Sequence, residues 1–139
     1  MALFKDDQDV YATIGKLFQD LAADEEMAPK FRKANTIVQY QYRDPEATIT
    51  LRLKEDEPGD VDLGETDMEP EVEMSMEADT AHRFFLGKVN VTTALARGQI
   101  KAKGPVAKIL KLVPLTKPIF PRYKAQLEEQ GRDDLVNVD

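Results

Sequence analysis

Three stretches of this 139-residue chain alternate between apolar and polar side chains, and this alternation constrains the fold more than any other feature. The stretches are residues 36–42, 47–54 and 71–77. In an extended strand, successive side chains point to opposite faces. Each stretch therefore predicts a strand with one apolar and one polar face. Such strands form a sheet that packs one face on a core and leaves the other in water.

Helical patterns lie on both sides of these strands. Apolar residues recur at helical spacing over 10–21, and Ile109, Leu110 and Val113 form a similar apolar stripe in a helix that starts after Gly104-Pro105. The remaining expected elements are a short helical turn holding Met27 and Phe31, helices at 79–86, 91–97 and up to about 130, and strands near Val61 and at 99–103. The order of elements predicts an α+β fold in a single domain, 1–139, with a five-stranded, mostly antiparallel sheet and helices on one face.

Charge is divided unevenly along the chain, whose formal net charge is −7. Residues 1–79 carry 8 basic and 21 acidic side chains, whereas residues 80–127 carry 10 basic and no acidic side chains. The basic segment predicts contact with an anionic ligand, an anionic membrane surface or nucleic acid. Internal pairing with the acidic half is the alternative. A pI of about 4.8 argues against nucleic acid, and we expect no nucleic-acid partner.

The composition gives little support for a catalytic or metal-binding site. There is no cysteine, which excludes disulfides and thiolate chemistry, and His82 is the only histidine. Ser75, the only serine, sits at a polar strand position, and no glycine-rich phosphate loop is present. The acidic stretch 55–79 does not have the spacing of a calcium-binding loop. We therefore expect no catalytic residue, no metal and no cofactor.

Neither a signal peptide nor an apolar run long enough for a membrane span is visible. The expectation is a soluble, cytoplasmic protein. Large apolar residues are dense over 84–123, where they alternate with lysines and arginines and never with acids. Apolar helices with a cationic rim suit a pocket for an amphiphile with a negative head group, or docking to anionic lipid. A plain core covered by lysine side chains explains the same pattern.

The strands named above, the segment 79–88, and the helix 91–97 are followed by 98–104, which reads GQIKAKG, and by the helix 105–112. This succession resembles the sterol-carrier-protein type 2 lipid-transfer family over about residues 10–130. The resemblance implies a sheet whose helix-covered face encloses an apolar tunnel. It also implies a fatty acid, fatty acyl-CoA, sterol or phospholipid as the ligand. The ending VNVD lacks the Ser-Lys-Leu type of peroxisomal signal that many eukaryotic members carry.

If the tunnel is present, its floor and walls follow from the predicted inward positions. The expected apolar lining is Val38, Tyr40, Leu51, Leu53, Met74, Met76, Phe84, Phe85, Leu95, Ile100, Ile109, Leu112, Val113, Ile119, Phe120 and Tyr123. The residues expected to meet an anionic head group or a membrane surface are Lys101, Lys103, Lys108 and Lys111.

Two other functions compete with lipid binding and transfer. A ligand-free interaction or scaffold domain, such as a homodimer, has a solid core and no response to fatty acids. An enzyme acting on acyl-CoA needs a nucleophile and a base, which the sequence does not bring together. The expected partner is a lipid or fatty acyl ligand, with transient contact to an anionic membrane, in a monomer or a homodimer.

Overall fold

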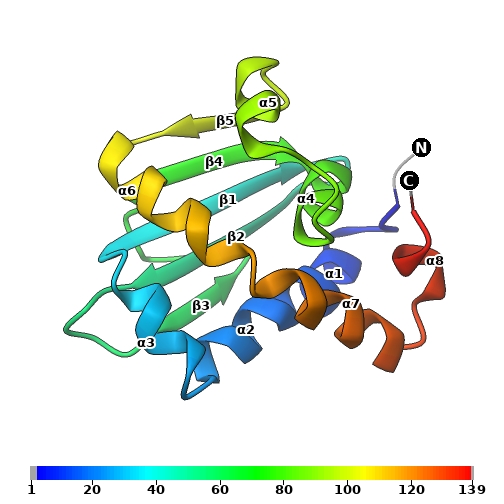
Figure 1. The fold of residues 1–139 in the computed structure, drawn as a ribbon, viewed down its shortest axis with the longest axis horizontal. Helices are drawn as coiled ribbons and strands as arrows, with labels where there is room; N and C mark the ends of the chain where they lie inside the picture. Colours follow the sequence, from blue (N-terminus) through cyan, green and yellow to red (C-terminus); the bar gives the residue numbers. More distant parts are fainter. Residues whose placement is uncertain (1–2, 139) are drawn as a thin grey trace.

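The computed structural model describes residues 3–138, so Met1, Ala2 and Asp139 of the predicted domain lie outside the described residues. A five-stranded sheet with the strand order β3-β2-β1-β4-β5 forms its centre (Figure 1). The strands are β1 (Thr36–Arg43), β2 (Ala47–Leu53), β3 (Asp60–Leu63), β4 (Val72–Glu77) and β5 (Ile100–Lys103). Neighbouring strands are antiparallel except β1 and β4, which are parallel. The predicted α+β fold with a mostly antiparallel sheet is confirmed.

The helices gather on one face of this sheet (Figure 1). The helical elements are α1 (Asp7–Val10), η1 (Tyr11–Gly15), α2 (Lys16–Ala23), α3 (Met27–Arg32), α4 (Ala78–Phe85), α5 (Val91–Ala96), α6 (Val106–Leu112), η2 (Val113–Thr116), α7 (Ile119–Glu129) and α8 (Asp133–Val136). Asn90 begins α5 as predicted, because its side chain accepts a hydrogen bond from the Thr93 amide.

The two faces of the sheet differ as the alternation predicted. Val38 and Val72 face the helices and are fully buried. The other face carries polar side chains that form hydrogen bonds with one another, both along β1 and across to β4. The Gln41 side-chain amide donates to Gln39 Oε1 at 2.7 Å and to Glu73 Oε1 at 2.9 Å. The apolar core therefore lies only between the sheet and its helices.

The first predicted helix is not one regular α-helix. The π-helical turn η1 separates α1 from α2. Gly15 ends this turn against β3, where an added Cβ would lie 2.9 Å from Leu63 Cδ2. Carbonyl groups of the turn accept hydrogen bonds from α7, with Gln126 Nε2 2.8 Å from Thr13 O and Gln130 Nε2 3.0 Å from Ala12 O. Helix α7 thus provides hydrogen bonds that a regular α-helix provides internally.

The chain ends in α8, which the sequence did not predict. Leu135 of α8 is buried, and Arg132 just before it binds Asp9 at the start of the chain. The described ends of the chain consequently lie side by side (Figure 1).

Candidate functional site

Two apolar pockets lie between the sheet and the helices. The first is bounded by β1 and β2, by α2 and α3, and by the segment from α6 to the start of α7. Its lining includes Phe18, Phe31, Leu51 and Phe85. The second is bounded by β1, β4 and β5 and by α4, α5, α6 and η2, and it includes Met74, Met76 and Ile100.

Tyr40 separates the two pockets, because its side chain lines both of them. Its ring stacks on Phe18, with centroids 5.3 Å apart, and meets Phe85 at a steeper angle. Desolvation by the surrounding side chains raises the pKa of Tyr40 to about 12. The hydroxyl is therefore neutral at physiological pH, and the partition between the pockets carries no charge.

Leu112 and Thr116 cover both pockets from the side opposite the sheet. They belong to the segment α6–η2, which crosses in front of β1 and β4 (Figure 1). This segment is anchored at both ends. Lys108 Nζ donates to the Asn35 carbonyl at 2.6 Å, and Arg122 pairs with Asp24 at 2.7 Å.

Between these anchors the segment is held by packing. Within residues 3–138, no group from 109 to 121 forms a hydrogen bond or salt bridge with another element. At the preceding corner, Gly104 has a φ of +131°, and an added Cβ would lie 2.4 Å from the Glu71 carbonyl oxygen. The corner before the cover therefore admits only glycine, and the side of the cover toward the sheet is largely apolar.

Each pocket has about 40 Å³ of free volume. That volume accommodates a few water molecules but not a long hydrocarbon chain.

One charged residue lines the first pocket. Arg32, at the end of α3, donates from one terminal nitrogen to the Glu57 carbonyl oxygen at 3.2 Å. Its Nε is buried and has no hydrogen-bond partner among residues 3–138. The role of Arg32 as a pocket residue is not visible in the sequence, because Arg32 lies in a run with Lys30 and Lys33 in which no spacing distinguishes it.

The chain is similar to known proteins in sequence and in fold. Residues 15–117 match the model of the SCP-2 sterol transfer family. The chain belongs to this family. The predicted resemblance to sterol carrier proteins is thereby confirmed. No curated protein sequence is significantly similar to the chain.

Solved structures show the same fold at low sequence identity. Sterol carrier protein 2 from Yarrowia lipolytica is 22% identical with a TM-score of 0.63, covering 76% of this chain and 88% of that one. Palmitated SCP2L2 from Aedes aegypti is 20% identical with a TM-score of 0.58, covering 78% and 94%. The sec-alkylsulfatase Pisa1 from Pseudomonas sp. is 19% identical with a TM-score of 0.59, covering 75% of this chain and 16% of the enzyme. The sterol-carrier fold therefore also occurs as part of an enzyme.

Most of the lining residues predicted for this sterol-carrier domain do line a pocket. Those at the first pocket are Tyr40, Leu51, Leu53, Phe85, Leu112 and Ile119. Those at the second are Tyr40, Met74, Met76, Phe84, Leu95, Ile100, Ile109, Leu112 and Val113.

Three predicted lining residues lie elsewhere. Val38 and Tyr123 are fully buried in the core and line neither pocket. Phe120 packs against Phe84, with ring centroids 6.1 Å apart, and lines neither pocket. The spacing that places a residue on the helix-covered face does not distinguish solid core from pocket wall.

The four predicted head-group lysines do not form one cluster. Lys101 and Lys103 lie opposite Ser75 and Glu73 and share a surface groove with Gln41, on the sheet face without helices. Lys108 is bound to the Asn35 carbonyl. Lys111 is exposed on α6. Of the four, only Lys111 lies on the cover of the pockets and forms no salt bridge with the part of the chain that the structure describes.

The only histidine and the only serine of the chain have separate hydrogen-bond partners. His82 is buried, with Nδ1 2.8 Å from the Tyr123 hydroxyl and Nε2 2.7 Å from the Leu135 carbonyl oxygen. Ser75 donates to Gln41 Oε1 on the opposite, polar face of the sheet. Residues 3–138 contain no group of three or more metal-ligating side chains and no helix of the length and apolarity that a membrane span requires.

Proposed function

We propose that this protein is a lipid carrier that holds the hydrocarbon chain of an anionic acyl lipid between its sheet and the α6–η2 cover. The observation that carries the proposal is the pair of apolar pockets on either side of Tyr40 beneath one shared cover. A palmitated sterol carrier with the same fold supports a fatty acyl ligand.

Binding replaces one apolar contact by another. The acyl chain takes the place of Leu112 against the sheet, while the anchors at Lys108 and Arg122 remain. Burial gains ~0.8 kcal/mol per methylene, so palmitate gains on the order of 10 kcal/mol before the costs of association and of moving the cover. The affinity depends only weakly on the length of the acyl chain, because one methylene group changes binding little in an apolar slot. Met74 and Met76 repack readily around different chains.

Arg32 gives the ligand its orientation. A buried guanidinium nitrogen without a partner is costly in an apolar pocket, and a carboxylate is its preferred acceptor. We therefore place the fatty acid carboxylate at Arg32 and the tail beyond Tyr40, in the second pocket. None of the lysines predicted for this role lines the first pocket.

Native mass spectrometry of delipidated protein titrated with palmitate and with methyl palmitate tests the proposal. We expect one ligand per chain and tighter binding of the acid than of the uncharged ester. Arg32→Met replaces the guanidinium by an apolar side chain of similar length. We expect the unmodified protein to prefer the acid at least about tenfold and the variant to lose this preference. Arg52→Met is the matched control, because Arg52 pairs with Glu57 and lines neither pocket.

Two results would contradict the proposal at different levels. A protein that binds neither ligand has a solid core, and the scaffold interpretation then replaces the carrier. A protein that binds both ligands equally, with Arg32→Met unchanged, is a carrier in which the head group lies away from Arg32.

A further inference from the structure

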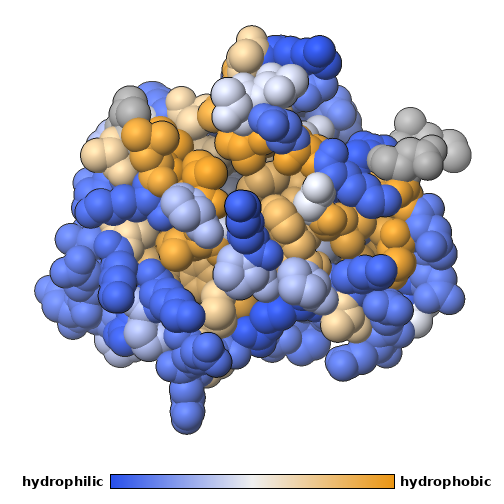
Figure 2. Space-filling view, viewed as in Figure 1, coloured by the Kyte–Doolittle hydropathy of each residue, from blue (hydrophilic) through white to orange (hydrophobic). Residues whose placement is uncertain are grey.

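Three exposed apolar side chains lie on elements that bound the second pocket. Leu110 of α6 is 63% exposed, and Leu95 of α5 and Val113 of η2 are each 37% exposed. Leu95 and Val113 also line the second pocket. Figure 2 shows apolar side chains over α6 and along the hollow between α5 and α6. Exposed apolar residues gathered on the elements around one pocket mark an interaction surface.

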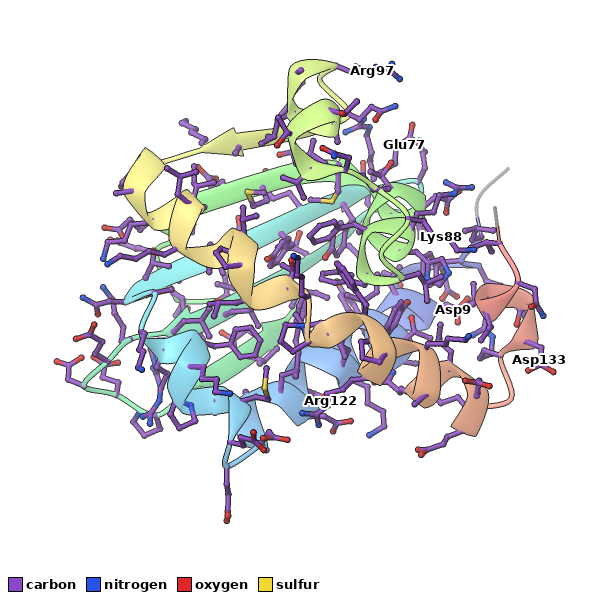
Figure 3. The ribbon with its side chains drawn as sticks, viewed as in Figure 1. Asp9, Glu77, Lys88, Arg97, Arg122 and Asp133 are labelled. Carbon is purple, nitrogen blue, oxygen red and sulfur yellow. The ribbon has the colours of Figure 1, made fainter. Side chains whose placement is uncertain are left out.

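Basic residues lie on the same elements or directly after them. Arg97, Lys111 and Lys117 are exposed, and none of them forms a salt bridge with residues 3–138. Arg97 extends outward from the end of α5 (Figure 3). No acidic residue occurs in the whole segment 80–127 that supplies these elements. We call the six residues Leu95, Arg97, Leu110, Lys111, Val113 and Lys117 the α5–α6 rim.

We propose that the α5–α6 rim docks on the surface of an anionic lipid bilayer and places the second pocket next to it. In this position the rim inserts its apolar side chains at the head-group boundary, and its basic side chains meet lipid phosphates. The purpose of docking, the exchange of an acyl lipid, rests on the proposed function. Docking itself rests on the rim alone.

Charge and shape favour a bilayer over a second copy of this chain. A symmetric dimer through the rim would bring Lys111 and Lys117 of both copies together, and like charges repel. A bilayer of negative lipids presents the opposite charge over an area without edges and accepts scattered apolar side chains.

Helix α6 takes part both in docking and in covering the pockets. Leu110 lies on the outer side of α6, and Leu112, two residues later, lies on the inner side over both pockets. Attraction of Leu110 into lipid pulls α6 in the direction that lifts Leu112 from the sheet. Since this stretch is held by packing between Lys108 and Arg122, the same movement that seats the protein opens the site.

Vesicle co-sedimentation at about 0.1 M salt tests the proposal. The probes are phosphatidylcholine vesicles with and without about 30% phosphatidylglycerol. We expect binding to the anionic vesicles only. Lys111→Glu with Lys117→Glu should weaken that binding at least about tenfold. Leu110→Asn, which leaves the charge unchanged, should weaken it about threefold to tenfold.

The matched control is Lys101→Glu with Lys103→Glu. It makes the same change in net charge on the sheet face without helices and should leave vesicle binding within about twofold of the unmodified protein. All changed side chains are exposed, so each variant should fold, which circular dichroism checks. Palmitate binding in solution should be unchanged in every variant.

Several outcomes would overturn docking through the rim. Equal losses in the two double variants would show dependence on net charge alone, and equal binding to neutral vesicles would exclude the electrostatic part. Self-association that Leu110→Asn abolishes in sedimentation velocity would assign the rim to a contact between copies. Normal vesicle binding with no palmitate binding would leave docking intact and refute the carrier function instead.

Discussion

The imidazole Nε2 of His82 lies 2.7 Å from the backbone carbonyl oxygen of Leu135, and this contact ties the last helix of the chain to α4. Because a carbonyl oxygen only accepts, Nε2 carries the proton and Nδ1 accepts from the Tyr123 hydroxyl at 2.8 Å. Burial lowers the pKa of His82, and Arg83 and Lys88 act in the same direction. The Leu135 hydrogen bond and Asp79 oppose them.

The first prediction is a loss of stability in mild acid. The folded protein holds His82 neutral, whereas the unfolded chain protonates it near its ordinary pKa of 6.5. The unfolded state therefore binds more protons as the pH falls below about 6.5, and the free energy of unfolding decreases by at most about 1.4 kcal/mol per pH unit. Urea denaturation between about pH 7.5 and pH 5 measures this slope.

His82→Gln supplies the control for this prediction, because it removes the titrating group. Its free energy of unfolding should be nearly constant over the same range. Asp9, Asp24 and Asp134 also have lowered pKa values, but they lose their contribution only at lower pH, below about 4. A flat profile for the unmodified protein would contradict the assignment of His82 as the titrating residue.

A second prediction concerns the Arg132–Asp9 ion pair, which links the two ends of the described chain. Arg132 binds Asp9 through two nitrogens, at 2.6 and 3.3 Å, and this pairing lowers the pKa of Asp9 against the opposing effect of its burial. Arg132→Gln should reduce the free energy of unfolding by about 1–2 kcal/mol. The exposed pair Lys16–Asp20 is the comparison, and Lys16→Gln should cost less than about 0.5 kcal/mol. Equal effects in urea denaturation would mean that the Arg132 pair is screened like any surface pair.

The π-helical turn η1 yields a third prediction. The buried Gln126 amide donates to Thr13 O at 2.8 Å. Gln126→Glu keeps the shape but replaces this donor by a carboxylate facing a carbonyl, so we expect a loss of about 2–3 kcal/mol. Gln130→Glu, at the exposed Ala12 carbonyl, should cost clearly less. Similar losses in chemical denaturation would show that burial does not distinguish the two contacts.

Sequence patterns predicted the local elements better than their long-range arrangement. The alternation around Val72 identifies the face of β4 that meets the core, but its parallel pairing with β1 depends on where the chain crosses the sheet. In α6 both sides are apolar, so the spacing placed Leu110 inward, whereas it is 63% exposed.

The candidate site was predictable where it is made of apolar strand positions and less so where it is polar. Tyr40, Leu51 and Met74 follow from period-two alternation. Arg32 reaches the first pocket because α3 ends beside the Gly59 loop, a tertiary relationship without a local signal. Lys101 and Lys103 have the right charge, but alternation along β5 directs them to the other face of the sheet.

Tyr40 lies between the two pockets, and we expect its replacement to have opposite effects on stability and on lipid affinity. Tyr40→Leu joins the pockets, so palmitate should bind several-fold more tightly, while the free energy of unfolding falls by about 1–3 kcal/mol through lost packing on Phe18. Tyr42→Leu, on the same strand but at neither pocket, should lose similar stability with no gain in affinity. Titration by native mass spectrometry measures both affinities. If the two variants bind palmitate equally, the acyl chain does not pass Tyr40, and the ligand occupies only one of the pockets.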